Sequence, residues 1–153
     1  DIENKDVIIS FGYRHIISKK ILNSLKRPII NLHMSYLPYN KGAHPNFWSF
    51  IYKTKKGVTI HEIDEGIDTG KIIFQKEVKF NLSKNKKLSF KKTYKILFKK
   101  LEKLFIKNYK LLIENNYKTK KNSKTLGKYN SLSELPSDLK NWDMEIFSYL
   151  KNR

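Results

Sequence analysis

Cysteine is absent from the 153 residues, and proline and glycine are scarce, with four and six copies. The lack of cysteine excludes disulfides, thiolate metal sites and a cysteine nucleophile. No apolar run approaches the roughly 20 residues that span a bilayer, so we expect no membrane partner. The chain starts at Asp1 without the basic and then apolar pattern of a secretory signal. We therefore expect a cytoplasmic protein, either processed or a fragment, whose length suits one domain.

Acidic residues are also few, with 14 Asp and Glu against 32 Lys and Arg, which gives a formal net charge of +18. The excess is concentrated in residues 81–130, which contain 16 lysines, two acids and no arginine. We favour a solvated lysine face on a helix. A surface that attracts an anionic substrate or RNA is the open alternative. The shortage of arginine, which suits bidentate phosphate contacts, makes nucleic acid an unlikely partner.

The first part of the chain has the pattern of a strand, a helix and a strand. Residues 6–11 are almost all apolar and precede Gly12, which predicts a strand buried on both faces. Residues 18–25 combine a leading serine with apolar residues at helical spacing, which predicts a short capped helix. Pro28 ends that helix, and residues 28–33 predict a second strand. Such a unit over about 30 residues favours parallel pairing.

The rest of the chain continues an α/β pattern. The expected elements are a loop over 34–45, a helix over 46–52, a strand over 58–63, a loop over 64–70, a strand over 71–80, an amphipathic helix over 89–115, a polar linker over 117–128 and an extension with a short helix over 142–150. The long helix is expected to bury its aromatic and leucine stripe and to expose its lysines. The fold class predicted is Rossmann-like α/β, with a mostly parallel sheet flanked by helices.

Three polar side chains point to chemistry at the end of the second strand. Asn31 and His33 are two residues apart, so their side chains share one face of the strand. Asp68 lies in a separate loop between Gly66 and Gly70. Without a serine or cysteine nucleophile, this set suits acyl transfer to an external amine. The imidazole takes the proton of the amine, the carboxylate orients it, and the amide stabilises the oxyanion.

Two motifs carry a family resemblance. The segments NLHMSYLPYNKGAHP and GVTIHEIDEGIDTGKII resemble the folate-dependent formyltransferases, which act on glycinamide ribonucleotide, methionyl-tRNA or nucleotide-linked amino sugars. The matching positions are Asn31, His33, Ser35, Leu37, Pro38, Gly42, Thr59, His61, Asp68 and Gly70. The family fold begins with further βα units that are missing here. We therefore expect a catalytic domain over 1–116, as the later part of that fold, and a linker and extension over 117–153.

The resemblance implies catalytic roles for Asn31, His33 and Asp68, and 10-formyltetrahydrofolate as the formyl donor. It implies that the pterin lies between the loop after the first strand and the loop before the catalytic Asp. The residues implied there are Phe11, Gly12, Tyr13, Arg14, His15, Ile16, Ile63, Asp64, Glu65, Gly66 and Ile67. The residues expected at the acceptor are Ser35, Tyr36, Leu37, Pro38, Gly42, His44 and Pro45.

Two residues and a metal site leave alternatives. A structural strand residue is the favoured interpretation of His61, and a general base is the alternative. Arg14 is equally compatible with an anionic ligand and with solvent. A zinc site from His33, His44, His61 and Asp64 has no compact ligand spacing, so no metal is expected.

The acceptor is expected to be a small, phosphate-bearing amine. The tail over 127–143 resembles extensions of amino-sugar formyltransferases, which favours a nucleotide-linked amino sugar. Glycinamide ribonucleotide is the runner-up, and methionyl-tRNA ranks last because the tail is too short for an added barrel. An RNA- or polyanion-binding module on the lysine-rich helix and a catalytically inactive remnant are the competing classes. A homodimer is an open alternative.

Overall fold

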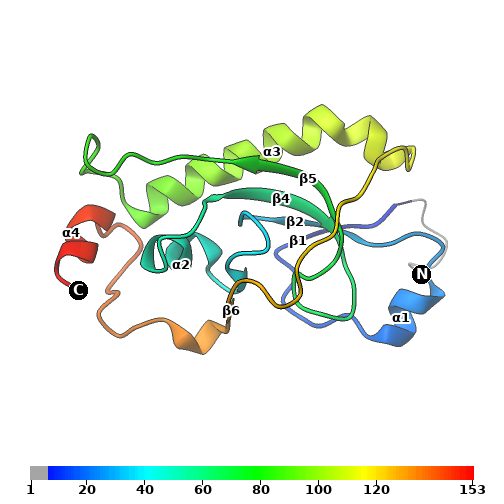
Figure 1. Cartoon of the computed structure of the whole chain (residues 1–153), viewed down its shortest axis with the longest axis horizontal. Helices are drawn as coiled ribbons and strands as arrows, with labels where there is room; N and C mark the ends of the chain where they lie inside the picture. The colour runs from blue at the N-terminus through cyan, green and yellow to red at the C-terminus, as the bar shows by residue number, and fades with distance from the viewer. Residues whose placement is uncertain (1–6) are drawn as a thin grey trace.

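The structure is a computed structural model and describes residues 7–153. Its centre is a four-stranded sheet in the order β1 (Ile9–Phe11), β2 (Ile30–His33), β4 (Gly57–Glu62) and β5 (Ile72–Glu77). Helix α3 (Phe90–Ile113) runs along one face of this sheet (Figure 1). The predicted α/β class is confirmed. Within the described residues, no helix is long and apolar enough to cross a membrane.

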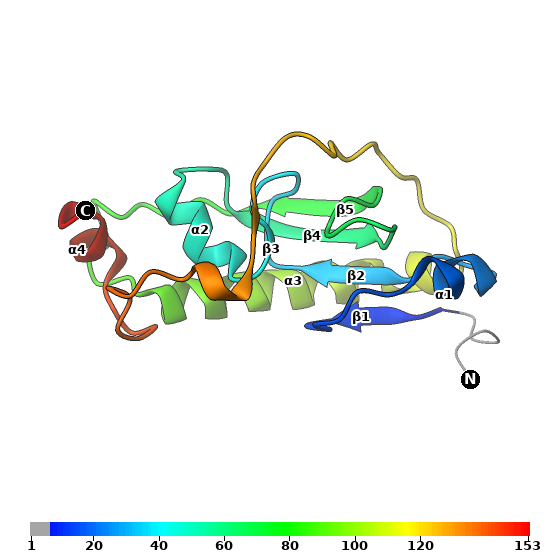
Figure 2. The same cartoon turned by 90° about the horizontal axis from the view of Figure 1, so that it is seen from below.

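The sheet combines parallel and antiparallel pairs. Helix α1 (Lys19–Ser24) links β1 to β2, which pair in parallel as expected, and Ser18 caps α1 by accepting from the amide of Ile21. Strands β4 and β5 run antiparallel to their neighbours, so the sheet is mixed. The connections between the strands explain this direction. Helix α2 (Pro45–Ile51) lies beyond the end of β2, so the chain turns back there before it enters β4. A loop without a helix then joins β4 to β5, which suits antiparallel neighbours (Figure 2).

Strand β1 differs from its expected burial. Asp6, the start of the predicted strand, lies outside the described residues, and β1 forms one edge of the sheet. Phe11 is 46% exposed instead of buried, and its ring packs on Phe98 of α3 at 5.7 Å between centroids. Phe98 is itself 41% exposed, although the helical stripe predicted a core position. Both rings stay open because no further strand covers this edge within residues 7–153.

The main core lies between α3 and the sheet. Ile30 and Ile60 alternate toward α3, where they meet Leu97 and Leu101, and all four are buried. The lysines of α3 are all exposed on the other side of the helix, which confirms the predicted amphipathic face. The same alternation directs Asn31 and its β4 neighbour His61 to the opposite face of the sheet.

The extension packs as part of the molecule. Helix α4 (Ile146–Lys151) buries Ile146 and Tyr149 against Phe47 of α2 and Phe90 of α3, and Figure 2 shows α4 beside α2. The helix begins later than predicted because residues 142–145 pair instead with the start of α3. The amide of Lys91 donates to the carbonyl of Trp142 at 2.7 Å.

Residues 117–130 cross the molecule from the end of α3 toward α2 (Figure 1). This segment ends in β6 (Tyr129–Asn130), which pairs in parallel with β3 (Lys41–Gly42), and a 3-10 turn follows at Leu132–Glu134. Neither two-residue strand has a sequence pattern of its own, so neither was predictable. The predicted linker thus contacts the loop that follows β2.

Adjacent leucines on α3 test the core. Leu112 is fully buried, whereas Leu111 is 36% exposed. We expect Leu112→Ala to lower the free energy of unfolding by about 2–5 kcal/mol, because it leaves a cavity. Leu111→Ala removes the same atoms at the surface and should change it by less than about 1 kcal/mol. Urea denaturation followed by circular dichroism measures both, and equal losses would contradict the packing described.

Candidate active site

The site is built on the sheet face opposite α3. The register of β2 with β4 sets Asn31 beside His61 and His33 beside Thr59. The loop after β4 then folds back over this face and brings Asp68 to the same place, with Asp68 in the left-handed region at φ 52°. The three residues predicted from the motifs are therefore neighbours, although the chain separates Asp68 from Asn31 by 37 positions.

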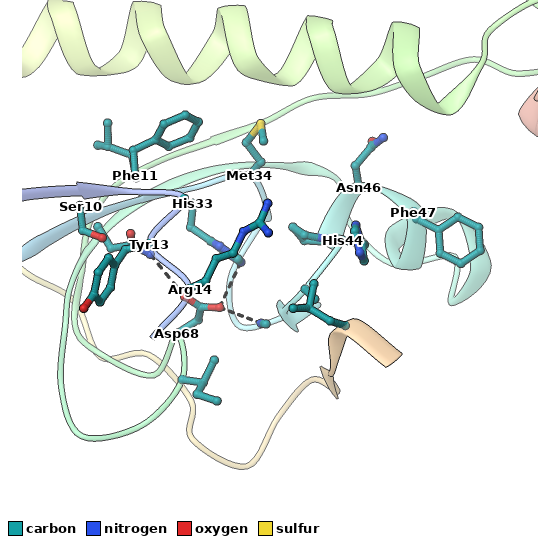
Figure 3. Close-up of a pocket in the computed structure, with 18 of the residues that line it drawn as sticks. Ser10, Phe11, Tyr13, Arg14, His33, Met34, His44, Asn46, Phe47 and Asp68 are labelled. Carbon is teal, nitrogen blue, oxygen red and sulfur yellow. Dashed lines mark hydrogen bonds and ion pairs between the residues drawn. The ribbon is translucent and has the colours of Figure 1, made fainter. Parts of the chain in front are cut away.

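The Asp68 carboxylate is the centre of the group. Its Oδ2 accepts from the Gly42 amide at 2.7 Å and lies 3.6 Å from Nε2 of His33. Its Oδ1 lies 3.4 Å from both Nδ2 of Asn31 and Nε2 of His61. Figure 3 shows Asp68 below His33, with dashed lines to its partners. The side chain is only 11% exposed, so these groups replace most of its water.

The protonation states suit proton transfer from an amine. Burial favours the neutral form of Asp68, yet the His33 and His61 rings and the Gly42 amide outweigh it and hold the carboxyl pKa well below its usual range. Burial also lowers the pKa of His33, and the nearby Asp68 only partly offsets this. At neutral pH the site therefore pairs an ionised carboxylate with a neutral imidazole, which is a competent proton acceptor.

The sequence favoured a purely structural role for His61, but its ring contacts the side chains of Asn31 and Asp68. Its Nδ1 lies 2.7 Å from the Glu62 carbonyl, which assigns the proton to Nδ1. Its Nε2 then accepts from Nδ2 of Asn31 at 3.2 Å. This contact fixes which end of the Asn31 amide faces Asp68. His61 is thus a positioning residue, and its place two residues after Thr59 on one strand face was the available signal.

A cavity of about 910 Å³ opens beside these residues (Figure 3). Most ligand pockets have about 300–1,000 Å³, so two substrates have room to meet here. One side is lined by residues that the resemblance implied for the folate, namely Phe11, Gly12, Tyr13, Arg14, His15, Ile16, Ile63, Asp64, Gly66 and Ile67. Gly42, His44 and Pro45 line it from the acceptor loop.

Five expected site residues do not line this cavity. Glu65 points away and pairs with Lys19 at 2.9 Å. The other four, Ser35, Tyr36, Leu37 and Pro38, shape the loop after β2 from behind. The hydroxyl of Thr59 donates to the Ser35 carbonyl at 2.7 Å, and Gln75 donates to that of Leu37 at 2.7 Å. Their motif pattern reflects this anchoring to the sheet.

The segment over 117–130 is bonded to the loop of Asp68 and to the loop after β2, a role that its composition did not indicate. The ammonium of Lys41 is buried and donates to the carbonyls of Ser123, Lys124 and Leu126 at 3.0–3.1 Å. The amide of Asn122 donates to the carbonyl of Asp68 at 2.9 Å. The segment over 117–130 therefore holds both the backbone of Asp68 and the backbone next to Gly42, whose amide binds the Asp68 carboxylate.

Comparison with known proteins identifies the family of the chain. The formyl transferase family matches residues 1–95, and the chain belongs to this family. A methionyl-tRNA formyltransferase of Thermodesulfovibrio yellowstonii is 45% identical over 83 residues, covering 54% of this chain and 27% of that protein. A dTDP-4-amino-4,6-dideoxyglucose formyltransferase of Mycobacterium bovis is 37% identical over 76 residues, covering 50% and 32%. The matched part of the chain thus spans less than a third of these relatives.

A solved structure matches nearly the whole chain. The formyltransferase PseJ from Anoxybacillus kamchatkensis, in complex with UDP-4,6-dideoxy-4-formamido-L-AltNAc and tetrahydrofolate, has a TM-score of 0.82 and 40% identity. The match covers 95% of this chain and 76% of that one. It therefore includes most of the extension, which the family match leaves out.

The coupling of His33 to Asp68 can be measured by NMR. We expect the His33 imidazole to titrate below pH 6.5, because burial disfavours its charged form. Asp68→Asn should lower the midpoint further, since the carboxylate favours the charged imidazole. Glu114→Gln, at the far end of α3, should leave it unchanged. A midpoint above pH 6.5, or a rise in Asp68→Asn, would contradict the assigned pair.

Proposed function

We propose that the protein transfers the formyl group of 10-formyltetrahydrofolate to the primary amine of a nucleotide-linked amino sugar. The observation that carries this proposal is the extent of the match to PseJ, 95% of the chain. The curated relatives match only about half of the chain. That half carries the catalytic residues shared by formyltransferases with different acceptors. The extension, which lines the cavity with Trp142, supports the choice of acceptor.

Formyl transfer needs the amine to lose a proton as its nitrogen attacks the formyl carbon. Neutral His33 accepts that proton through a ring nitrogen, and ionised Asp68 stabilises the imidazolium that forms. The bond between the formyl carbon and N10 of the folate then breaks, and N10 leaves with the proton that the His33 imidazolium gives up, which returns His33 to its neutral form. The acceptor keeps the formyl group as an amide, and tetrahydrofolate is released.

Asn31 is suited to the negative charge that develops on the formyl oxygen. One amide hydrogen of Asn31 is held by His61 at 3.2 Å. The other points toward Asp68 over a longer distance of 3.4 Å, so a bound formyl oxygen can take it with little cost. A donor placed in this way lowers the barrier by about 3–4 kcal/mol.

The folate side of the cavity suits a flat heterocycle with a polar edge. Phe11, Tyr13 and Ile16 give apolar surface, and all three are at least 46% exposed. The returning loop beside Ile63 and Gly66 offers backbone groups to the same space. The 10-formyltetrahydrofolate supplies the activated formyl group, and these residues bind and orient it.

An assay of tetrahydrofolate release tests the proposal. The full-length protein is supplied with 10-formyltetrahydrofolate and, in turn, a UDP-linked amino sugar, a dTDP-linked amino sugar, glycinamide ribonucleotide and methionyl-tRNA. We expect turnover with a nucleotide sugar, and about a 10²–10³-fold lower kcat in Asn31→Ala and His33→Ala. Leu111→Ala on α3 is the matched surface control.

Two results would overturn this proposal. Full turnover in Asn31→Ala or His33→Ala would remove the assigned mechanism. A clear preference for glycinamide ribonucleotide or methionyl-tRNA over both nucleotide sugars would replace the acceptor class. A melting temperature equal to that of the unaltered protein shows that each variant is folded, so that its lost turnover comes from the changed side chain.

A further inference from the structure

Trp142 is a large aromatic surface that the extension contributes to the cavity. It lines the cavity together with its neighbours Asn141 and Asp143, and it is 38% exposed. Its backbone is nevertheless fixed. The Trp142 carbonyl accepts from the amide of Lys91 at 2.7 Å, and two residues later Met144 accepts from Phe90 at 3.3 Å. An indole that is held in place and still open to a cavity is a preformed surface for a flat ligand.

Two aromatic rings support the indole from the protein side. The His44 ring lies 5.1 Å from Trp142 at an interplanar angle of 34°, and Phe47 meets it edge-on at 6.2 Å. His44 immediately precedes α2 and adopts the left-handed region at φ 50°. The ring is therefore presented by a defined turn and not by a mobile side chain alone. With both rings in place Trp142 is still 38% exposed, and an exposed aromatic ring is the surface on which a nucleobase stacks.

Arg14 belongs to the loop that lines the folate side of the cavity, but its guanidinium brings a positive charge close to His44. Figure 3 shows its side chain reaching from the loop after β1 toward His44. Burial lowers the pKa of His44, and the nearby Arg14 charge lowers it further. Within residues 7–153, no carboxylate lies at ion-pair distance from Arg14. Lys91, by contrast, already pairs with Asp143 at 3.1 Å. An unpaired guanidinium in a cavity suits a phosphate.

The order of these groups matches the order of parts in a nucleotide sugar. Figure 3 shows the Arg14 side chain between His33 and His44, and Trp142 lies against His44 at 5.1 Å. Along the cavity, the aromatic surface of Trp142 is therefore followed by the guanidinium of Arg14 and then by the His33 imidazole. A nucleotide sugar presents a base, a diphosphate and a sugar amine in the same sequence.

We propose that Trp142 stacks on the base and Arg14 binds the diphosphate of the acceptor, so that the extension forms its nucleotide subsite. This inference rests on the proposed function, because it assigns the binding of the same acceptor. It makes Trp142 and Arg14 residues that determine affinity for the acceptor, while the family's shared motifs carry the reaction.

Titration of the full-length protein with UDP and with dTDP, followed by calorimetry, tests the subsite without turnover. We expect Trp142→Ala to weaken binding of the better nucleotide about 10- to 100-fold, the usual effect of losing one base-stacking ring. Trp142→Phe keeps a ring and should recover most of the affinity. Trp48→Phe is the matched control, because Trp48 is buried against Tyr52 outside the cavity.

Arg14→Ala separates the two halves of the subsite. It should weaken UDP binding about tenfold and leave binding of uridine, which has no phosphate, unchanged. Trp142→Ala should weaken both. Binding of 10-formyltetrahydrofolate by Trp142→Ala, at the affinity of the unaltered protein, shows that the variant is folded.

The outcomes distinguish this inference from the proposed function. The subsite is wrong if neither nucleotide binds, or if Trp142→Ala binds as tightly as the unaltered protein, even when a nucleotide sugar is formylated. If nucleotide binding depends on Trp142 while no formyl transfer occurs, the proposed reaction is contradicted and the nucleotide subsite is supported.

Discussion

The nearly buried carboxylate of Asp68 is the constraint on which the site depends. An ionised group away from water is costly unless donors surround it. Here the donors come from separate parts of the chain: Asn31 and His33 on β2, and the Gly42 amide in the acceptor loop. The His61 ring on β4 holds the Asn31 amide in place beside them. The sheet register, the returning loop and the acceptor loop must all be in place before this charge is balanced. These contacts hold Asp68 ionised, while burial lowers the pKa of His33 and leaves its imidazole neutral at neutral pH.

This dependence extends to the C-terminal part of the chain. Asn122 donates to the backbone of Asp68, and Lys41, beside Gly42, donates to three carbonyls of the crossing segment. The three backbone acceptors satisfy the donors of this ammonium and so fasten the segment, although burial still lowers the pKa of Lys41. The extension then continues to Trp142 at the cavity. One run of chain thus both supports the Asp68 carboxylate and lines the cavity beside it. The large positive charge contributes less, since the lysines of α3 face solvent.

The sequence predicted the parts of the molecule that have local patterns. The long helix, the parallel pair β1 and β2, and the meeting of Asn31, His33 and Asp68 all followed from spacing or motif. The antiparallel β4 and β5 did not, because their direction depends on how the chain reverses near α2. The roles of Lys41 and Asn122 were hidden as well, because a lysine and an asparagine in polar segments look like surface residues. The exposure of Phe11 and Phe98 depends on which strands cover the sheet edge, and no local pattern records it.

The central claim is that Asp68 acts through its charge and not only through its shape. Steady-state kinetics of Asp68→Asn, a replacement of nearly equal size, tests this most directly. The amide cannot stabilise the His33 imidazolium, so kcat should fall at least about 10²-fold while KM for 10-formyltetrahydrofolate and for the acceptor changes little. A kcat close to that of the unaltered protein, or a loss confined to KM, would contradict the account.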